Sequence, residues 1–355
     1  MPENNVTLRF DGKQISGWTS VSINRSLDSL ADSFDLNMVD AWEGEVTQLK
    51  PEVECTIFID NKKVLTGYID KVGIPVDANN QNYQVNGRSK TQDLVDCSAD
   101  NEPGSWEKIS ALNLIKELCA PYNIEVRNEV SLGEDIKKFS LNTGESPFEA
   151  IQRICQDRGV LCLSDVDGKL VLTSAGIVSA YDKLILGQNV LAAEATYEFS
   201  NRFKIYKIKA QKSEDGESWK KSTTQIYGEA RDDGIVRNRV KVIAADNQMS
   251  NALAQKRAAW EAQTRAGRSG TVSIKIPAWY QSNGNLWEPN FLVACHIAPL
   301  RLSPDSPLLI NEVNYSQDES GTLCNLKLVR QDAYAPEPPK EVKTKEKKKT
   351  YGFGW

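Results

Sequence analysis

Histidine is the side chain best suited to acid–base chemistry near neutral pH, and this sequence has one, His296. A Ser-His-Asp or Cys-His nucleophile would have to use it. It lies in the stretch FLVACHIA, where apolar residues alternate as in a strand. We therefore predict that His296 is a packed or exposed strand residue and that no catalytic histidine exists.

The seven cysteines could serve a metal or redox site, but no CxxC pair occurs among them. Most stand beside apolar residues, as in LCAPY and VLCLS. They are Cys55, Cys97, Cys119, Cys155, Cys162, Cys295 and Cys324. With one histidine, a zinc site would also need an unusual set of ligands. We predict buried, reduced thiols, no metal and no cofactor.

Two close pairs of carboxylates could hydrolyse a glycosidic bond without histidine: Glu134 with Asp135, and Glu145 with Glu149. Such enzymes hold their acid and their nucleophile or base roughly 5 to 9.5 Å apart. Among 48 acidic residues, chance proximity explains both pairs better. The glycine-containing loops lack the GxxxxGK[ST] and GxGxxG spacings, so nucleotide binding is not predicted either.

Four basic residues and a tryptophan share one expected helix in the stretch 251–280: Lys256, Arg257, Arg265, Arg268 and Trp260. On a helix Arg257 and Arg265 point about 80° apart and Lys256 about 100° further round, so they form no stripe for phosphates. We predict a solvated face or intersubunit ion pairs. The alanine-rich face allows close packing within the subunit or against a neighbouring one, and Trp260 is predicted as its large buried group.

Lysines also alternate with apolar residues in NRFKIYKIKAQK, residues 201–212. We predict a strand that places Phe203, Ile205, Ile208 and Ala210 inside a sheet and the lysines on its solvent side. The net charge of -5 agrees with a protein that does not bind polyanions over a large surface.

The first part of the chain, residues 1–97, contains six short stretches rich in Val, Ile, Thr and aromatic residues, separated by turn formers such as DGK and DNK. This pattern predicts a small β-barrel or sandwich. The period then changes, and residues 98–180 predict an α+β module. One helix ends at Pro121; a second has Ser146 as N-cap, Pro147 at its first position and Glu149 in a capping box. Gly159 ends it, and a hairpin turns at Asp167-Gly168.

Strand patterns return in residues 181–334, interrupted by the helix near 247–267, which Gly267 and Gly270 are expected to end. We predict a second β-barrel domain with a helical insertion, or a discontinuous domain. The fold class is thus α+β and predominantly β.

The segment 335–355 differs, with three prolines and six lysines between Lys340 and Lys349. We predict a tail that is disordered or ordered by a partner. Its aromatic residues Tyr351, Phe353 and Trp355 either dock on a partner or are an accident of a free terminus.

Length and hydropathy limit the number of domains and the kind of segments that the chain can contain. At 355 residues the chain can form two or three domains with separate cores. No apolar run approaches the roughly 18 residues that cross a bilayer, and MPENNVTLRF lacks the features of a secretory signal. We expect synthesis and folding in a cytoplasm, without stable membrane insertion.

Several long stretches resemble the baseplate hub (tail) proteins of Mu-like contractile-tailed bacteriophages and prophages. They include VTLRFDGKQISGWTSVSINRSLDSLADSFDL, NGRSKTQDLVDC, DRGVLCLSDVDGKLVLT and KRAAWEAQTRAGRSGTVSIKIPAWYQSNGNLWEPN. None is a catalytic motif, and the resemblance rests on their order and on coverage of nearly the whole chain. The lysine-rich ending is the part that does not match the family pattern.

The resemblance implies a homotrimeric ring with two similar β-barrel domains per subunit, so that three chains present six barrels. Such a hub is a symmetry adapter in the virion. It would join the hexameric tail tube to the trimeric spike, contact other baseplate proteins and let phage DNA pass through its channel after assembly in the host cytoplasm. The family implies no catalytic, metal or cofactor residues. The alternatives are a tail-associated peptidoglycan hydrolase and, less favoured, a DNA-binding protein.

Overall fold

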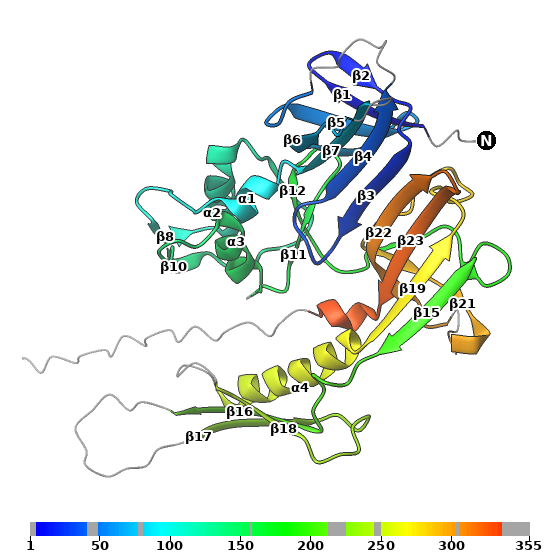
Figure 1. Cartoon of the computed structure of the whole chain (residues 1–355). Helices are drawn as coiled ribbons and strands as arrows, with labels where there is room; N and C mark the ends of the chain where they lie inside the picture. Colours follow the sequence, from blue (N-terminus) through cyan, green and yellow to red (C-terminus); the bar gives the residue numbers. More distant parts are fainter. Residues whose placement is uncertain are drawn as a thin grey trace, which may run out of the picture.

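Alternating apolar residues build the strands that dominate the chain (Figure 1). The computed structural model describes residues 5–40, 49–76, 81–156, 158–211, 225–244, 250–300, 302 and 305–335. The strand β3 (Ser20–Ser26) shows the principle, because Val21, Ile23 and Arg25 are buried while the residues between them are half-buried. A period of two therefore gives each such strand one face toward the core.

One sheet of 13 strands forms the largest part of the structure, which we call the β body. Its N-terminal lobe contains β1 (Val6–Phe10), β2 (Lys13–Ile15), β3, β4 (Ser33–Asp40), β5 (Glu54–Ile59), β6 (Lys62–Gly73) and β7 (Gln81–Ser89). Its C-terminal lobe contains β13 (Val178–Ser179), β15 (Ala192–Tyr197), β19 (Gly270–Ile276), β20 (Phe291–Val293), β22 (Leu308–Asp318) and β23 (Gly321–Val329). Two further short elements of this lobe, β14 (Leu184–Ile185) and β21 (Cys295–His296), pair with each other, and a 3-10 turn spans Ala298–Leu300.

The two lobes meet at an antiparallel pairing of β3 with β22, which we call the seam. Apolar residues of both lobes belong to one buried cluster, with Ile23 and Leu36 from the first and Val313 and Leu326 from the second. The predominantly β class is confirmed. The expected pair of separate small barrels is not seen, because the described strands of both lobes hydrogen-bond into one open sheet.

An α+β module lies between the lobes in sequence and beside the N-terminal lobe in space (Figure 1). It contains α1 (Gln92–Asp96), β8 (Ser105–Ile109), α2 (Ala111–Cys119), the 3-10 turn η1 (Ala120–Tyr122), β9 (Val126–Asn128), β10 (Ile136–Ser140), α3 (Pro147–Gln156), β11 (Leu161–Ser164) and β12 (Leu170–Thr173). Both predicted helices and the hairpin are confirmed.

The predicted capping box of α3 is also present. The Ser146 backbone amide donates to Glu149 Oε2 at 2.8 Å, and the Glu149 amide donates to Ser146 Oγ at 3.1 Å. Two donors at the start of the helix are thereby satisfied, which fixes where the helix begins. Gly159, which follows the helix, has a positive φ of 66° and so suits the left-handed conformation that ends helices.

The insertion in the second β region is larger than the single helix that was expected. The strands β16 (Ile205–Gln211), β17 (Gln225–Arg231) and β18 (Val240–Ala244) form a separate sheet, and α4 (Asn251–Arg268) packs on it. We call these four elements the arm; they project from the C-terminal lobe in Figure 1. Three strands that were assigned to a second barrel therefore belong to the arm.

The end of α4 differs from the prediction as well, because Gly267 lies inside the helix. A Cβ atom at Gly267 would lie 2.5 Å from the backbone nitrogen of Ala333, in the 3-10 turn η3 (Gln331–Tyr334). This glycine permits close packing between two backbones instead of ending the helix. Across the described part of the chain, no helix is both long and apolar enough to cross a membrane.

Candidate interaction surfaces

The residues with the greatest potential for chemistry are spread over the molecule. His296 is exposed on β21, next to the buried Cys295, so its strand assignment is confirmed. Within the described ranges, no group of three or more His, Cys, Asp or Glu side chains could hold a metal ion. The four carboxylates considered for glycoside hydrolysis all belong to the α+β module but have different surroundings.

Glu134 and Asp135 are exposed in the loop before β10. Glu145 is buried and accepts hydrogen bonds from the Asn142 amide at 2.7 Å and from Arg153 Nη2 at 2.7 Å. Glu149 caps α3. The second pair therefore stabilises a loop and a helix start, which agrees with the interpretation that their proximity in sequence is accidental.

The described structure has all seven cysteines as free thiols, five of them buried and two, Cys97 and Cys162, half-buried. Burial raises the pKa of Cys55, Cys119 and Cys295 to about 12. These thiols are protonated near neutral pH and therefore poor nucleophiles. Cys155 and Cys162 form a close pair that sequence spacing did not indicate, with 3.3 Å between their sulfurs.

The basic residues of α4 are engaged within the chain. Glu261 is buried on this helix, and its carboxylate pairs with Arg257 at 3.1 Å and with Arg265 at 2.8 Å, one helical turn to each side. Arg268 Nε donates to the carbonyl of Ala333 at 3.1 Å. Arg257 and Arg265 are therefore paired within the helix and only partly exposed, whereas Arg268 and Lys256 are exposed as predicted for a solvated face. Ion pairs with another subunit stay a prediction.

Trp260 is half-buried in the single chain, so within the subunit it is not the large buried group of α4, and its burial against a neighbouring subunit stays a prediction. The helix instead turns Leu253, Ala254, Ala258 and Ala262 inward. The indole of Trp260 donates from Nε1 to the carbonyl of Ala335 at 2.7 Å, and the Arg257 guanidinium lies 4.6 Å from the ring centroid. Its amphipathic ring therefore fixes the end of the described chain on the helix.

Residues Gln331–Ala335, which we call the clasp, contact several distant parts of the chain. Besides the bonds to α4, Gln331 Nε2 donates to the carbonyl of Ala175 at 2.9 Å. The Tyr334 hydroxyl hydrogen-bonds to the side chains of Asp28 and Asn311 at the seam. The clasp thus connects the arm, the seam and the chain that follows the module. Residues 336–355, including Tyr351, Phe353 and Trp355, lie outside the described residues.

In β16 the predicted alternation is only partly right. Ile208 is buried as expected, but the other fully buried residue is Tyr206, while Ile205 shares the opposite face with Lys207. Phe203 precedes the strand and is half-buried, and the side chain of Ala210 lies outside the described part. The outer face of this small sheet also carries the exposed Val240 and Val242.

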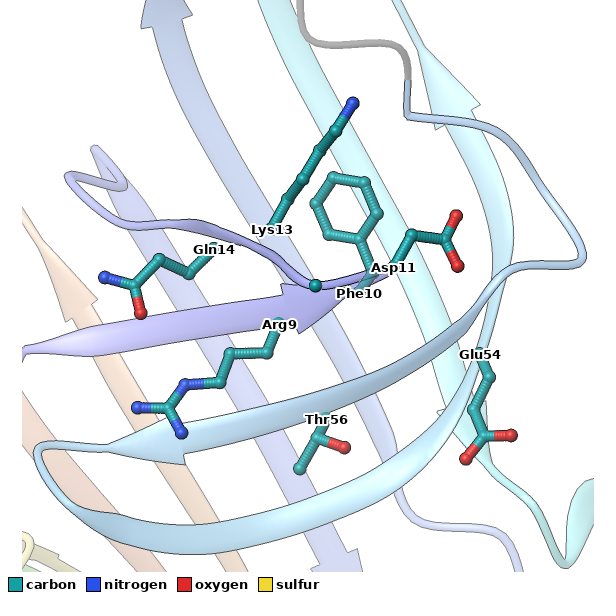
Figure 2. A pocket seen from close by; sticks show the side chains of 8 residues that line it. Arg9, Phe10, Asp11, Lys13, Gln14, Glu54 and Thr56 are labelled. Atoms are coloured by element: carbon teal, nitrogen blue, oxygen red, sulfur yellow. The ribbon is translucent and has the colours of Figure 1, made fainter.

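A hollow lies at the hairpin of β1 and β2, where it faces β5 (Figure 2). It measures about 680 Å³, and its lining comprises Arg9, Phe10, Asp11, Gly12, Lys13, Gln14, Glu54 and Thr56. The Arg9 guanidinium stacks 4.1 Å from the centroid of the Phe58 ring. In Figure 2 the charged side chains, of both signs, spread around the turn without converging on one point. This arrangement suits a contact with another protein surface better than catalysis on a small substrate.

A buried ion pair lies at the seam. Arg25 Nε is 3.0 Å from Asp32 Oδ2, and both side chains are almost fully buried. Glu288, from the C-terminal lobe, approaches Arg25 Nη1 at 3.9 Å and is itself half-buried. Burial raises the pKa of Asp32 to about 6, although Arg25 opposes the shift. The ion pair lies within the N-terminal lobe, and Arg25 links it to the C-terminal lobe through Glu288.

Exposed apolar side chains follow the free edge of the β body. β15 is the last strand of the sheet, and Leu191, Tyr197 and Phe199 are exposed at its two ends. An unpaired edge strand with apolar neighbours can bind another chain. This edge and the hollow near β1 are therefore candidate surfaces for protein contacts.

Comparison with known proteins gives consistent matches along the chain. Residues 5–89 match the family described as "Mu phage baseplate assembly protein GpP-like, N-terminal". Residues 91–174 match "Baseplate hub protein gp44-like, second domain". Residues 250–337 match "Mu phage baseplate assembly protein GpP, fourth domain". The matches cover both lobes, the module and α4.

One curated relative and two solved structures are similar over nearly the whole chain. The baseplate hub protein gp44 of Escherichia phage Mu is 33% identical over 338 residues, which cover 93% of this chain and 89% of that protein. The 43 kDa tail protein of prophage MuSo2 from Shewanella oneidensis is 31% identical with a TM-score of 0.84, covering 94% of this chain and all of that one. The tail protein from Neisseria meningitidis MC58 is 21% identical with a TM-score of 0.80, covering 94% and 99%.

Proposed function

Because this chain belongs to the baseplate hub protein family of Mu-like phage tails, we propose that it assembles into a homotrimeric ring that adapts the sixfold tail tube to the threefold spike. Each subunit would contribute its two β lobes in place of two barrels. Three chains would then present six lobes. Its place would be the tail baseplate of the virion, after assembly in the host cytoplasm.

The observation that carries this proposal is the seam. Antiparallel pairing of β3 with β22 and a common apolar core join the two lobes directly. A symmetry adapter needs this property, because each subunit must hold two similar contact surfaces at a fixed angle. Two lobes connected only by a linker would leave that angle undefined.

The partners in this proposal are the tail tube, the spike and other baseplate proteins, and phage DNA would pass through the ring without stable binding. The apolar edge at β15 and the hollow at β1 and β2 are the surfaces that we propose for such contacts. We also propose the division of the chain at residues 97, 180 and 334, with the arm as an insertion in the last β domain.

We propose a structural role without catalysis. The alternative, a peptidoglycan hydrolase, receives no support from the carboxylates that the sequence offered. Glu134 and Asp135 are exposed, and Glu145 and Glu149 stabilise a loop and a helix.

The mass of the purified full-length protein in solution tests the proposal. Light scattering coupled to size exclusion should give three times the chain mass of 39.5 kDa. Co-purification with the spike protein of the same tail should retain three copies of each. A protein that stays monomeric at all concentrations would contradict the hub function, and cell-wall clearing by the purified protein would favour the hydrolase.

A further inference from the structure

We propose that Cys155 and Cys162 form a redox-active dithiol, which a peroxide oxidises to an intramolecular disulfide that ties α3 to β11. This inference goes beyond the hub function, and its chemistry does not depend on it. The pair stands out among the cysteines because the two sulfurs are already in contact.

The geometry supports the pair directly. Cys162 Sγ lies 3.3 Å from Cys155 Sγ and donates its S–H to it. The sulfurs need to approach by roughly 1.3 Å to reach the disulfide length of about 2.05 Å. Cys155 is in the last turn of α3 and Cys162 is in the next strand, and both belong to a core that the two elements share.

An oxidant can reach the pair. Both cysteines line a cavity of about 290 Å³ between the α+β module, α4 and the clasp. Trp260 and Tyr334 form part of its opposite wall. Cys162 is half-buried, whereas Cys155 is only 1% exposed. A small peroxide would therefore meet Cys162 first.

The reaction balances with hydrogen peroxide as the oxidant. The Cys162 thiolate attacks one peroxide oxygen, the O–O bond breaks, and the departing hydroxide takes up the proton lost by Cys162 to give water and a sulfenic acid. The Cys155 sulfur then attacks the sulfenic sulfur, the S–O bond breaks, and the leaving oxygen takes up the Cys155 proton as a second water. Two thiols are oxidised by two electrons, and one peroxide is reduced to two waters.

The surroundings make this reaction slow. The side-chain hydrogen bond that Cys155 shares with Cys162, followed by burial, raises the pKa of Cys155. A protonated resolving thiol protects the pair in a reducing cytoplasm, where thiols remain reduced in any case. If the chain is a virion component, as proposed above, release of the particle removes that protection, and the disulfide would then stabilise the module on the released tail.

Intact mass and peptide mapping of the full-length protein test the proposal. After reduction, removal of the reductant and incubation with hydrogen peroxide over a time course, the chain should lose the mass of two hydrogen atoms. Arg158 lies between the two cysteines, so trypsin separates them into peptides 154–158 and 159–169. The oxidised protein should yield these two peptides joined, and a reductant should release them.

The variants Cys155→Ser and Cys162→Ser should abolish the linked peptide, and Cys97→Ser is the matched control. Cys97 is the other half-buried cysteine, and its replacement should leave the link intact. Phenylarsine oxide, which bridges two neighbouring thiols, gives an independent readout on the reduced protein. It should add once to the wild type and to Cys97→Ser, and not to Cys162→Ser.

Three results would overturn the proposal: oxygen additions at single cysteines without a link, a link between Cys119 and Cys162 in place of the assigned pair, or an arsenical adduct that persists in Cys162→Ser. The phenylarsine oxide experiment remains decisive even if a serine variant of the buried Cys155 folds poorly. The solution mass of the protein, which tests the hub function, is a separate measurement.

Discussion

The β body and the arm bury their residues in different ways. The body has a large core of Ile, Leu, Val and Trp side chains contributed by both lobes. The arm has a small one of Ile208, Ala254 and Ala258, and it relies on close backbone approach and ion pairs. Because burial of apolar area is the main stabilising term in folding, the body should set the global stability of the chain and the arm should open more easily.

Removal of the Trp279 side chain in the body should have the largest effect. The residue is fully buried, contacts Tyr315 edge-on, and its indole donates to the carbonyl of Leu323 at 2.8 Å. We expect Trp279→Ala to lower the free energy of unfolding by about 5 kcal/mol, measured by chemical denaturation. Trp260→Ala is the control in the arm, with an expected loss of roughly 1–2 kcal/mol because that ring is half-buried. Equal losses would remove the distinction between the two regions.

Arg25→Gln should weaken the seam by about 3–4 kcal/mol at pH 7, because it leaves Asp32 buried without its counter-charge. Asp32 already has a pKa of about 6, above its ordinary value of 3.8, and Arg25 is the residue that lowers it. A carboxyl with a raised folded-state pKa binds its proton more tightly in the folded protein than in the unfolded one. Its contribution to stability therefore falls as the pH rises from the ordinary pKa of 3.8 through the raised value of about 6.

The loss of folding stability in Arg25→Gln should therefore become smaller as the pH falls from 7 toward 5, where Asp32 takes up a proton. Denaturation of variant and wild type at several pH values measures the difference. A deficit that is constant between pH 5 and pH 8 would show that the buried charge is not its cause.

Gly228→Ala addresses the packing of the arm. A Cβ atom there would lie 2.2 Å from the backbone of Ala254 in α4, so helix and sheet must move apart. We expect a cost of about 2 kcal/mol, confined to the arm. Hydrogen exchange should accelerate in α4 and β17 and remain unchanged in β22. Gly73→Ala in the body is the control, since its Cβ would meet only the Gln84 side chain at 3.4 Å.

Glu261→Gln should have the smallest effect, about 1 kcal/mol, because its two arginine partners are partly exposed and screened by solvent. The loss should diminish in high salt and should again appear as faster exchange in α4. A shift of the global unfolding transition by this variant would mean that the arm and the body unfold together.

Local patterns predicted the secondary structure of the module well. Ser146, Pro147 and Glu149 specify the start of α3 through contacts within one helical turn, and Asp167-Gly168 specifies a tight turn. Such contacts involve residues close in sequence, so a single sequence contains the whole signal. The same holds for the strand alternation in β3.

Long-range pairing could not be predicted in this way. Nothing in the sequence of β16 distinguishes a strand of the arm from a strand of the body, because both alternate. Trp260 was expected on the inward face of α4 because of its size. Ala254 and Ala258 face the sheet instead, because the helix lies close to the backbone of Gly228 and only small side chains fit between them. The Cys155–Cys162 pair depends on how α3 and β11 pack, which spacing alone does not reveal.

The pairing of β3 with β22 also constrains the order of events on the ribosome. Asn314 of β22 donates to Ser22 of β3 across 292 residues of chain. While a nascent polypeptide emerges, one side of β3 therefore has no native neighbour until β22 has been synthesised. During that interval the backbone N–H and C=O groups along this side of β3 are unpaired, and such an edge can pair with another chain.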